Sequence, residues 1–446
     1  MPDTTRSSPP QQTQKRTRSG CQTCRKRRKR CDQRRPACTS CSKLNLQCVY
    51  GLNVRWGSTR ESFINATMPQ TGLGVGTKDA LNDLLEGINT SPKLHRLIDT
   101  TLDGDGRNIL IRFLTTGYRL LASDFMSDDT WLTTHFPLCE NSKACLLSLV
   151  AFQAAVDPEH EEDFDRFYDQ ALTQFTKETC GLGKIPETSL FFAGLFMCTI
   201  NLSRLMPYTN HLNAIIAMVM GWLKLDTPIR SDTQEFLSLL GFLDLQTHTI
   251  NRMTPQNYVW YTYCRGQHGV HRISGLPYSL MDLLSSVHLQ GTEQNLLSWT
   301  PPPGAPAQQL LWKASRFAGI LSVYELRLQS GSLSEVLPSS LGASLSPQVL
   351  VHNILGLIQQ CVIFVPSESG QFKQTLTYPL VMAASQRSAL AGSEKDFICQ
   401  TIRDMASERN HFAYQGILGV VQEFWKSKDS TIEETARRLD VELPLC

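Results

Sequence analysis

Six cysteines near the start of the chain constrain its folding more than any other feature. They follow the spacing C-x2-C-x6-C-x6-C-x2-C-x6-C, so the second half of the segment is a near copy of the first. Two cysteines separated by two residues can bring two thiolates to one metal ion from a tight turn, and a tetrahedral set of soft thiolates favours zinc. The segment has almost no apolar side chains, so bound metal must supply most of its folding free energy, ~10 kcal/mol or more for structural zinc. The predicted metal ligands are Cys21, Cys24, Cys31, Cys38, Cys41 and Cys48.

Iron–sulfur ligation and disulfide bonding are the alternative uses of such cysteines. Iron–sulfur ligation does not explain why every residue between Cys24 and Cys31 is Arg or Lys. Disulfides do not suit a chain whose first residues lack the apolar core of a secretory signal. Six cysteines cannot form two separate four-ligand sites, but two zinc ions can both be tetrahedral if two thiolates bridge them. We therefore expect two zinc ions as the cofactor.

The distribution of charge separates this basic head from the rest of the chain. Residues 1–60 contain 15 Lys and Arg against 2 Asp and Glu, whereas the remaining residues contain 28 against 39. A basic head on an acidic body predicts a polyanionic partner for the head alone, and we expect double-stranded DNA. A basic run can also act as a nuclear localisation signal, and the two roles can coexist, so we expect a nuclear protein.

The cysteine segment resembles the zinc binuclear cluster of fungal transcription regulators. The family pattern is C-x2-C-x6-C, a loop, C-x2-C and a last cysteine, and the run from Arg25 to Asp32 matches the family's R-x-R-K-x-K-C-D. Pro36 lies where the family has its loop proline. The resemblance implies two bridging thiolates and two further thiolates for each zinc ion. By the same resemblance, Cys21 and Cys38 would be the bridging pair, Cys24 and Cys31 would complete one zinc ion, and Cys41 and Cys48 the other.

The resemblance also implies how the head would contact DNA. The family reads CGG-type triplets from a short helix after the first C-x-x-C, which predicts Arg27 and Arg28 as base-contacting residues. Arginine can bind a guanine edge with two hydrogen bonds, whereas contacts to phosphates add affinity without sequence information. The expected phosphate contacts are Lys26, Lys29, Arg30, Arg34 and Arg35. Together with Arg25, these residues and the two base-contacting arginines form the predicted DNA-binding set.

Composition divides the chain into four predicted parts. Residues 1–17 are a flexible basic lead-in, 18–57 the zinc cluster, 58–106 a linker and 107–446 a helical regulatory domain. Many relatives of this kind dimerise through a coiled coil after the cluster. Between residues 78 and 102 the apolar residues form only two short helical stretches, without three consecutive heptads. The sequence therefore predicts no zipper, so either the helical body dimerises or the protein binds DNA as a monomer.

The body shows helical periodicity throughout and predicts an all-α fold. No series of strands and no fixed repeat is present. The predicted helices are 108–123, 142–156, 164–179, 187–205, 211–223, 233–245, 278–287, 307–329, 347–363, 378–390, 394–407, 412–426 and 431–439. The apolar stretch 205–223 contains Pro207, Asn210 and His211, so a buried helix is favoured over a membrane span.

Three stretches of the body resemble the all-helical regulatory region of one group of fungal cluster regulators. Residues 274–284 are similar to that region's G-L-P-x-S-L-x-D-L-L segment, 377–383 to its W/Y-P-L-x-x-A helix start, and 145–155 to an early apolar helix. The resemblance implies a regulatory body without catalytic residues. We therefore expect a transcription regulator of RNA polymerase II genes that controls a metabolic or secondary-metabolite gene set through contacts with the transcription machinery. The alternative is a ligand-binding or enzymatic body tethered to chromatin by the zinc cluster.

Several features of the body have competing interpretations. Cys264, His268 and His271 could bind a metal ion, but an ordinary loop is favoured. The acidic and aromatic stretch 159–168 resembles an activation segment and also begins a good amphipathic helix, which we favour. The tail 439–445 is a second, weaker candidate for activation. The eight cysteines outside the cluster are expected as buried free thiols.

Overall fold

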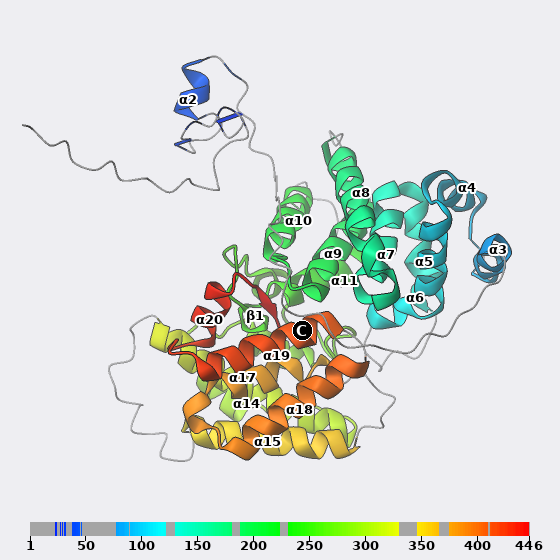
Figure 1. Ribbon diagram of the computed structural model, residues 1–446. Helices are drawn as coiled ribbons and strands as arrows, with labels where there is room; N and C mark the ends of the chain where they lie inside the picture. Colours follow the sequence, from blue (N-terminus) through cyan, green and yellow to red (C-terminus); the bar gives the residue numbers. More distant parts are fainter. Residues whose placement is uncertain are drawn as a thin grey trace, which may run out of the picture. The chain divides into compact units, whose positions relative to one another are not determined.

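The computed structural model shows a small cysteine-rich head and a large helical body (Figure 1). The two compact units are residues 1–73 and 74–446. In the head, the structure describes residues 23, 24, 27, 29, 31, 32, 38–44 and 46. In the body, it describes 77–88, 90–121, 130–180, 188–223, 231–329, 346–364, 374–408 and 411–445.

The first half of the body is an array of α-helices separated by short 3-10 turns. The α-helices are α3 (Thr77–Gly87), α4 (Pro92–Thr101), α5 (Gly104–Thr115), α6 (Thr130–Thr134), α7 (Lys143–Val156), α8 (Glu161–Cys180), α9 (Thr188–Ser203) and α10 (Thr209–Leu223). The 3-10 turns are η1 (Gly117–Leu121), η2 (Phe136–Asn141) and η3 (Pro158–His160).

The second half is also helical, with one small sheet. Its helices are α11 (Ser231–Leu243), α12 (Tyr278–Leu284), α13 (Thr292–Ser298), α14 (Pro306–Gln329), α15 (Pro347–Phe364), α17 (Thr377–Ser385), α18 (Gly392–Glu408), α19 (His411–Lys426) and α20 (Ile432–Arg438). The short elements are η4 (Gln246–His248), β1 (Thr249–Ile250), the π-helix η5 (Trp260–Cys264), η7 (Arg387–Ala389) and β2 (Leu443–Pro444). The predicted all-α body is therefore confirmed, with one two-stranded addition.

Polar side chains just before the first residue explain where several helices begin. Ser91, Asp103, Ser142 and Thr431 precede α4, α5, α7 and α20, and each accepts a backbone N–H of the first turn with its side-chain oxygen. These N–H groups have no partner within the helix, so a capping side chain stabilises the start by about 1 kcal/mol.

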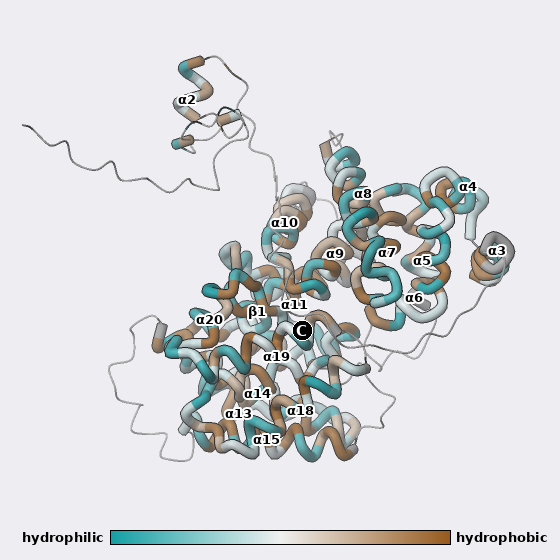
Figure 2. Tube along the Cα trace, viewed as in Figure 1, coloured by the Kyte–Doolittle hydropathy of each residue, from teal (hydrophilic) through white to brown (hydrophobic). Residues whose placement is uncertain are grey.

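Two hydrophobic clusters fill the body, and α9 belongs to both. Phe192, Phe196 and Ile200 of α9 pack in a first cluster with α3 to α8, whereas Phe191 and Leu195 pack in a second cluster with α10 to α20. A helix that is apolar on all sides must be buried on all sides. The sequence of α9 meets this condition, and Figure 1 shows the helix between the two groups of elements. In Figure 2, a helix such as α8 alternates hydrophobic and hydrophilic residues, as expected for one buried face.

The two helices α3 and α4 lie inside the interval 58–106 that the sequence assigned to the linker. Leu81, Leu85, Leu94 and Ile98 are buried in the first cluster together with α5 and α7. The sequence missed this packing because the two stretches are short and interrupted, and only their partners in the body bury them. The leucines that a coiled coil would need are therefore already used inside the body, which agrees with the predicted absence of a zipper.

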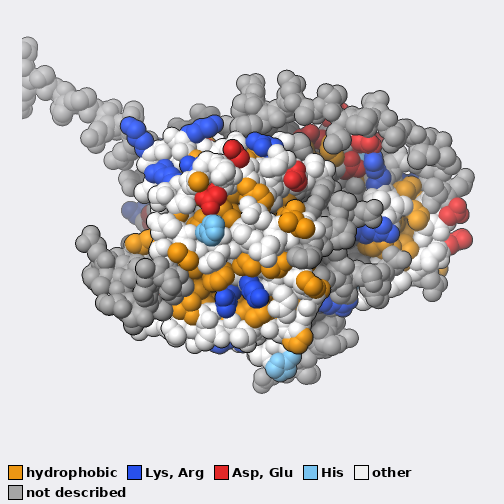
Figure 3. Space-filling model, turned by 90° about the horizontal axis from the view of Figure 1, so that it is seen from below, with side chains coloured by type: hydrophobic (Ala, Val, Ile, Leu, Met, Phe, Trp, Pro, Cys, Tyr) orange, Lys and Arg blue, Asp and Glu red, His pale blue; other side chains and the backbone are white. Residues whose placement is uncertain are grey.

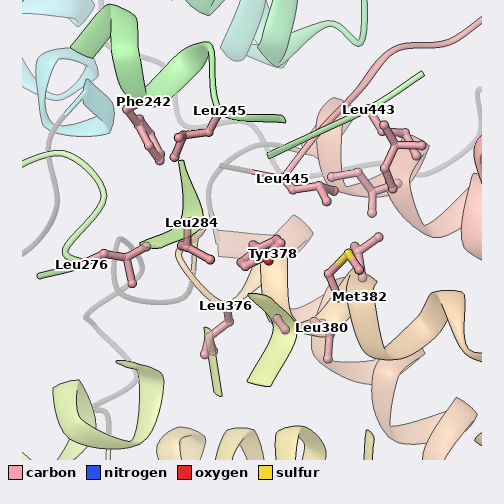
Figure 4. Packing of buried hydrophobic residues seen from close by; sticks show 14 of the residues in the cluster. Phe242, Leu245, Leu276, Leu284, Leu376, Tyr378, Leu380, Met382, Leu443 and Leu445 are labelled. Atoms are coloured by element: carbon pink, nitrogen blue, oxygen red, sulfur yellow. The ribbon is translucent and has the colours of Figure 1, made fainter. Parts of the chain in front are cut away.

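The end of the chain is built into the body, so its interpretation as an activation tail was wrong. β2 pairs antiparallel with β1, and the backbone N–H of Leu445 donates to the carbonyl of His248 at 2.9 Å. Leu443 and Leu445 are buried in the second cluster, part of which is drawn with Tyr378 in Figure 4. A short apolar tail can be buried in this way only when a distant strand supplies its hydrogen bonds, which the local sequence does not reveal.

Glu442 anchors this tail at the beginning of α10. Its buried carboxylate accepts the N–H of Tyr208 at 2.7 Å, the hydroxyl of Thr209 at 2.6 Å and the N–H of Met253 at 3.0 Å. A carboxylate with no water around it is tolerated when several donors point at it. Residue 442 thus joins the tail to two segments that each lie more than 180 positions earlier in the sequence.

Other predictions about the body are confirmed by burial. Phe164, Phe167 and Tyr168 of the acidic stretch are buried in α8, so the helix interpretation holds over the activation segment. Among the described residues, no helix is long and apolar enough to cross a membrane. Of the body cysteines expected to be buried, Cys180 is exposed and Cys446 lies outside the described residues, while the remaining six are buried free thiols. These six are Cys139, Cys145, Cys198, Cys264, Cys361 and Cys399.

Candidate metal centre

Each half of the head begins a helical turn at its C-x-x-C pair. In the first half, the N–H of Arg27 donates to the carbonyl of Thr23 at 3.2 Å and the N–H of Lys29 to that of Cys24 at 3.0 Å. In the second half, α2 (Thr39–Ser42) follows Cys38. In the second half, the turn brings the sulfurs of Cys38 and Cys41 to within 4.8 Å of each other, which is the geometry that a shared metal ion needs.

The described cysteine sulfurs gather in the interior of the head. Cys24, Cys31, Cys38 and Cys41 form a buried cluster of their own. The Sγ atoms of Cys24 and Cys38 are 3.5 Å apart, and those of Cys24 and Cys41 are 3.9 Å apart. Two thiolates on one tetrahedral zinc ion, at about 2.3 Å from the metal, are separated by about 3.8 Å. The donor set and the Cys24–Cys38 spacing therefore fit zinc, whereas the short Cys24–Cys41 distance joins two cysteines that the resemblance assigns to different zinc ions.

Cys38 occupies the centre of this arrangement. It belongs to one group with Cys24 and Cys41 and to a second with Cys31 and Asp32, and within each group the potential ligand atoms lie within 4.8 Å of one another. A thiolate that approaches ligands from both halves is in the position of a bridging ligand. The N–H of Cys41 also donates to the sulfur of Cys38 at 3.4 Å.

A polar contact that the sequence analysis missed joins the two halves of the head. The carboxylate of Asp32 accepts the N–H of Thr39 at 3.1 Å and also the hydroxyl of Thr39. Asp32 follows the last cysteine of the first half, and Thr39 follows the first cysteine of the second half. The sequence does contain a signal for this link, namely an acidic residue directly after one cysteine and a helix start directly after another. The N–H groups at a helix start have no partner within the helix, so they need an acceptor such as this carboxylate.

The described part of the predicted DNA-binding set contains one half-buried and one exposed side chain. Arg27 is half-buried, and its Nη1 is shielded from solvent without a hydrogen-bond partner, whereas Lys29 is exposed. An exposed ammonium on a flexible stem suits a phosphate contact. The predicted residues outside the described part of the chain are Cys21, Arg25, Lys26, Arg28, Arg30, Arg34, Arg35 and Cys48.

The three potential ligands in the middle of the body do not form a metal site. Cys264 is buried with its sulfur directed at the carbonyl of Leu237 at 3.3 Å, while His268 is exposed. His271 is buried, and its Nδ1 accepts the N–H of Ser274 at 3.2 Å. Burial lowers the pKa of His271 to about 4, so this imidazole is neutral and is used to hold a turn. Within the described residues, the groups suited to a metal ion are those in the head.

Comparisons with known families match both parts of the chain. The fungal Zn(2)-Cys(6) binuclear cluster domain matches residues 19–56, and its description implies two zinc ions held by six cysteines. The fungal specific transcription factor domain matches residues 113–293 and 288–436, which together make up more than half of the chain. Both are domains of transcription regulators rather than of enzymes. No solved structure matches the chain significantly.

Individual relatives share short, closely similar segments with this chain. It is 46% identical over 56 residues to the transcriptional regulatory protein pro1 of Neurospora crassa, a match that covers 12% of this chain and 8% of the relative. It is 46% identical over 46 residues to the lysine biosynthesis regulatory protein LYS14 of Saccharomyces cerevisiae, covering 10% and 6%. It is 56% identical over 34 residues to sterol uptake control protein 2 of Candida albicans, covering 8% and 5%. The chain therefore spans less than a tenth of the length of these relatives.

Proposed function

We propose that this chain, which belongs to the family of fungal-specific transcription factors with a Zn(2)-Cys(6) binuclear cluster, is a sequence-specific DNA-binding regulator of RNA polymerase II genes in the nucleus. The observation that carries the proposal is the buried set of cysteine sulfurs next to an uninterrupted run of basic residues. Zinc would fix the fold of the head, and the basic run would supply its attraction to a polyanion.

The proposed zinc ligands are the six cysteines of the head. The central position of Cys38 supports a bridging role for it, and Cys21 would be the second bridge by its equivalent place in the repeat. Asp32 would help to keep the two halves in register through Thr39. The full ligand set is Cys21, Cys24, Cys31, Cys38, Cys41 and Cys48.

The proposed contacts with DNA divide into base and phosphate contacts. Arg27 and Arg28 would bind the guanines of a CGG-type triplet in the major groove. The exposure of Lys29 supports a phosphate contact there. The further proposed DNA-contacting residues are Arg25, Lys26, Arg30, Arg34 and Arg35.

The helical body would then be the regulatory part. The packing of α3 and α4 with α5 supports a body that begins near residue 77, with the zinc cluster in 18–57 and a linker between them. We propose that this body controls a metabolic or secondary-metabolite gene set through the transcription machinery. A homodimer would use the body rather than a zipper, because the leucines of α3 and α4 are buried. The exposed Val349, Val362 and Ile363 on α15 support this, and Figure 3 shows hydrophobic side chains among few charged ones at the α15 side of the body.

A binding experiment with the full chain tests the proposal. Fluorescence anisotropy with a CGG-containing duplex should give tight binding that a zinc chelator abolishes and that a scrambled duplex competes for poorly. Arg28→Ala should cost about 1–3 kcal/mol and relax the base preference. Lys29→Ala should weaken binding to all sequences alike and reduce the slope of log affinity against log salt by about one.

Lys43→Ala is the matched control, because Lys43 is an exposed lysine of the head outside the proposed contact set. It should change affinity and salt slope less than Lys29→Ala does. Binding that survives chelation, or that scrambled DNA competes for equally, would reject the proposal.

A further inference from the structure

Two cysteines of the body, far from the zinc cluster in sequence, lie in direct contact. The Sγ atoms of Cys139 and Cys145 are 3.0 Å apart, and both side chains are completely buried. Cys139 is in η2 and Cys145 is in the first turn of α7. A disulfide bond is about 2 Å long, so a movement of about 1 Å would bring the two sulfurs to bonding distance.

The surrounding structure holds this pair in place. Ser142, between the two cysteines, caps α7 by accepting the N–H of Cys145 at 3.0 Å. Glu178 of α8 accepts the hydroxyl of Ser142 at 2.6 Å and the N–H of Ala144 at 3.1 Å. The turn from η2 into α7 is therefore fixed by hydrogen bonds on both sides, and the close approach of the sulfurs is a consequence of that turn.

A metal site does not account for the pair. Within the described residues, Cys139 and Cys145 belong to no group of three or more potential ligands. Two thiolates alone are too few for a structural zinc site, which takes four ligands. The remaining chemistry open to two adjacent thiols is oxidation to a disulfide.

We propose that Cys139 and Cys145 form an intramolecular disulfide when the protein meets a low-molecular-weight disulfide oxidant. One thiolate attacks a sulfur of the oxidant and releases a thiol, which leaves a mixed disulfide. The second thiolate then displaces the remaining thiol and closes the Cys139–Cys145 bond. In total, two S–H bonds of the protein and one S–S bond of the oxidant are lost, and one protein S–S bond and two thiols of the former oxidant are formed.

Burial determines how fast this reaction proceeds. The pKa of the Cys145 thiol is raised well above its ordinary value, first by burial and then by its contact with Cys139, so little thiolate is present in the closed structure. Reaction must pass through a local opening of η2, which is a single short 3-10 helix. Oxidation should therefore be slower than modification of the exposed Cys180, but it should end in a bond that the native fold already accommodates.

Trypsin provides a direct test, because Lys143 lies between the two cysteines. Cleavage after Arg119, Lys143 and Arg166 gives peptides 120–143 and 144–166, each with one cysteine. The full-length zinc-loaded chain is treated with glutathione disulfide, its free thiols are blocked with N-ethylmaleimide during denaturation in acid, and it is digested without reductant. We expect the two peptides to be joined, with a mass lower by two hydrogens than their sum, and to separate on reduction.

The chain without substitutions is enough to reject the proposed disulfide. Recovery of both peptides in blocked or glutathione-bound form, after Cys180 has been fully modified, would overturn the proposal. Joining of either peptide to a third cysteine instead would do the same. Oxidation of the zinc cluster yields different peptides and does not interfere.

Two variants add a matched control. Cys198→Ser, at another buried body cysteine, should leave the joined peptides unchanged. Cys139→Ser should abolish them. The oxidised body should also melt a few degrees higher than the reduced body, because the cross-link lowers the entropy of the unfolded chain. Cys139→Ser should remove that difference, and an equal rise in the variant would contradict the proposal.

Discussion

The fold of the head and the fold of the body are stabilised by different interactions. The described interior of the head consists of four cysteine side chains, and its apolar Leu44 and Leu46 are exposed. The interior of the body contains fully buried aromatic residues, such as Phe113 in its first large apolar cluster and Trp312 in its second. Burial of one large apolar side chain contributes about 1.5–3 kcal/mol, so the body can fold on its hydrophobic effect, whereas the head depends on metal binding. One chain thus contains a unit stabilised by metal binding and a unit stabilised by the hydrophobic effect, and the two should unfold under different conditions.

Removal of a central zinc ligand should produce the largest difference between the stability of the head and that of the body. Cys38→Ser takes away the thiol that approaches ligands of both halves, and the head should lose its fold and its DNA binding, a loss of ~10 kcal/mol or more of metal-dependent free energy. The melting temperature of the body should not change. Hydrogen exchange of head and body peptides, measured on the full chain, would follow both.

The control for Cys38→Ser is Cys198→Ser, which removes a buried body thiol. It should lower the melting temperature of the body and leave exchange in the head unchanged. A destabilised body in Cys38→Ser, or a protected head that still binds DNA, would show that the two regions are not independent.

A second prediction concerns Glu442, the buried carboxylate of the body's tail. Glu442→Gln keeps the shape of the side chain but replaces one carboxylate oxygen by an NH2 group, which then faces either the N–H donors of Tyr208 and Thr209 or that of Met253. Loss of a buried, multiply bonded carboxylate should cost about 3 kcal/mol of the body's free energy of unfolding. Urea unfolding measures this loss, and DNA affinity should remain unchanged.

Asp440→Asn is the matched control for Glu442→Gln. Asp440 is exposed and has a left-handed backbone with φ 58°, which asparagine also adopts readily. This variant should unfold within about 0.5 kcal/mol of the parent. Equal stability of both variants would mean that the tail contributes little to the body.

A third prediction uses pH, since all ten histidines lie in the body. Burial lowers the pKa of His248 to about 3 and that of His271 to about 4, from an ordinary value of 6.5. Between pH 6.5 and about 4 the unfolded chain therefore binds more protons than the folded one. The contribution of these two neutral imidazoles to the free energy of unfolding is therefore fully present above pH 6.5, and it is lost as the pH falls below that value. At pH 5.5, His248 and His271 should each lower the free energy of unfolding by about 1.4 kcal/mol, which makes about 3 kcal/mol together.

Melting of the body from pH 7.5 to 5.5 tests this effect. His248→Phe keeps an aromatic ring stacked on Tyr378 and should reduce the loss by about 1.4 kcal/mol. His268→Asn, at an exposed position, should leave the pH dependence unchanged. If His248→Phe had the same pH dependence as the parent, the buried neutral imidazole would not be the cause.

Local sequence features were enough to predict most helices of the body. The predicted helix 307–329 is α14 (Pro306–Gln329), and 347–363 is α15 (Pro347–Phe364). Boundaries agree this well because apolar periodicity and proline positions act within a few residues. The predicted helix 378–390 is shorter in the structure, where α17 ends at Ser385 and a 3-10 turn follows.

Features that depend on distant partners were not predictable. One example is the contact between α11 and the π-helix η5, which begins at Trp260. In α11, Gly241 lies so close to Trp260 that an added Cβ would be 3.0 Å from backbone atoms of that residue. No pattern in the sequence around Trp260 indicates this contact, because its partner is about twenty residues away.

The sequence by itself determined the cysteine repeat, the basic run and the helical character of the body. Each of these is local, since ligand spacing, charge and periodicity are properties of consecutive residues. Only the tertiary structure decided that α3 and α4 belong to the body, that Glu442 fixes the tail, and that Cys139 meets Cys145. These contacts arise from the packing of segments that are separated in sequence or joined by a specific turn, and burial selects them only after the chain has folded.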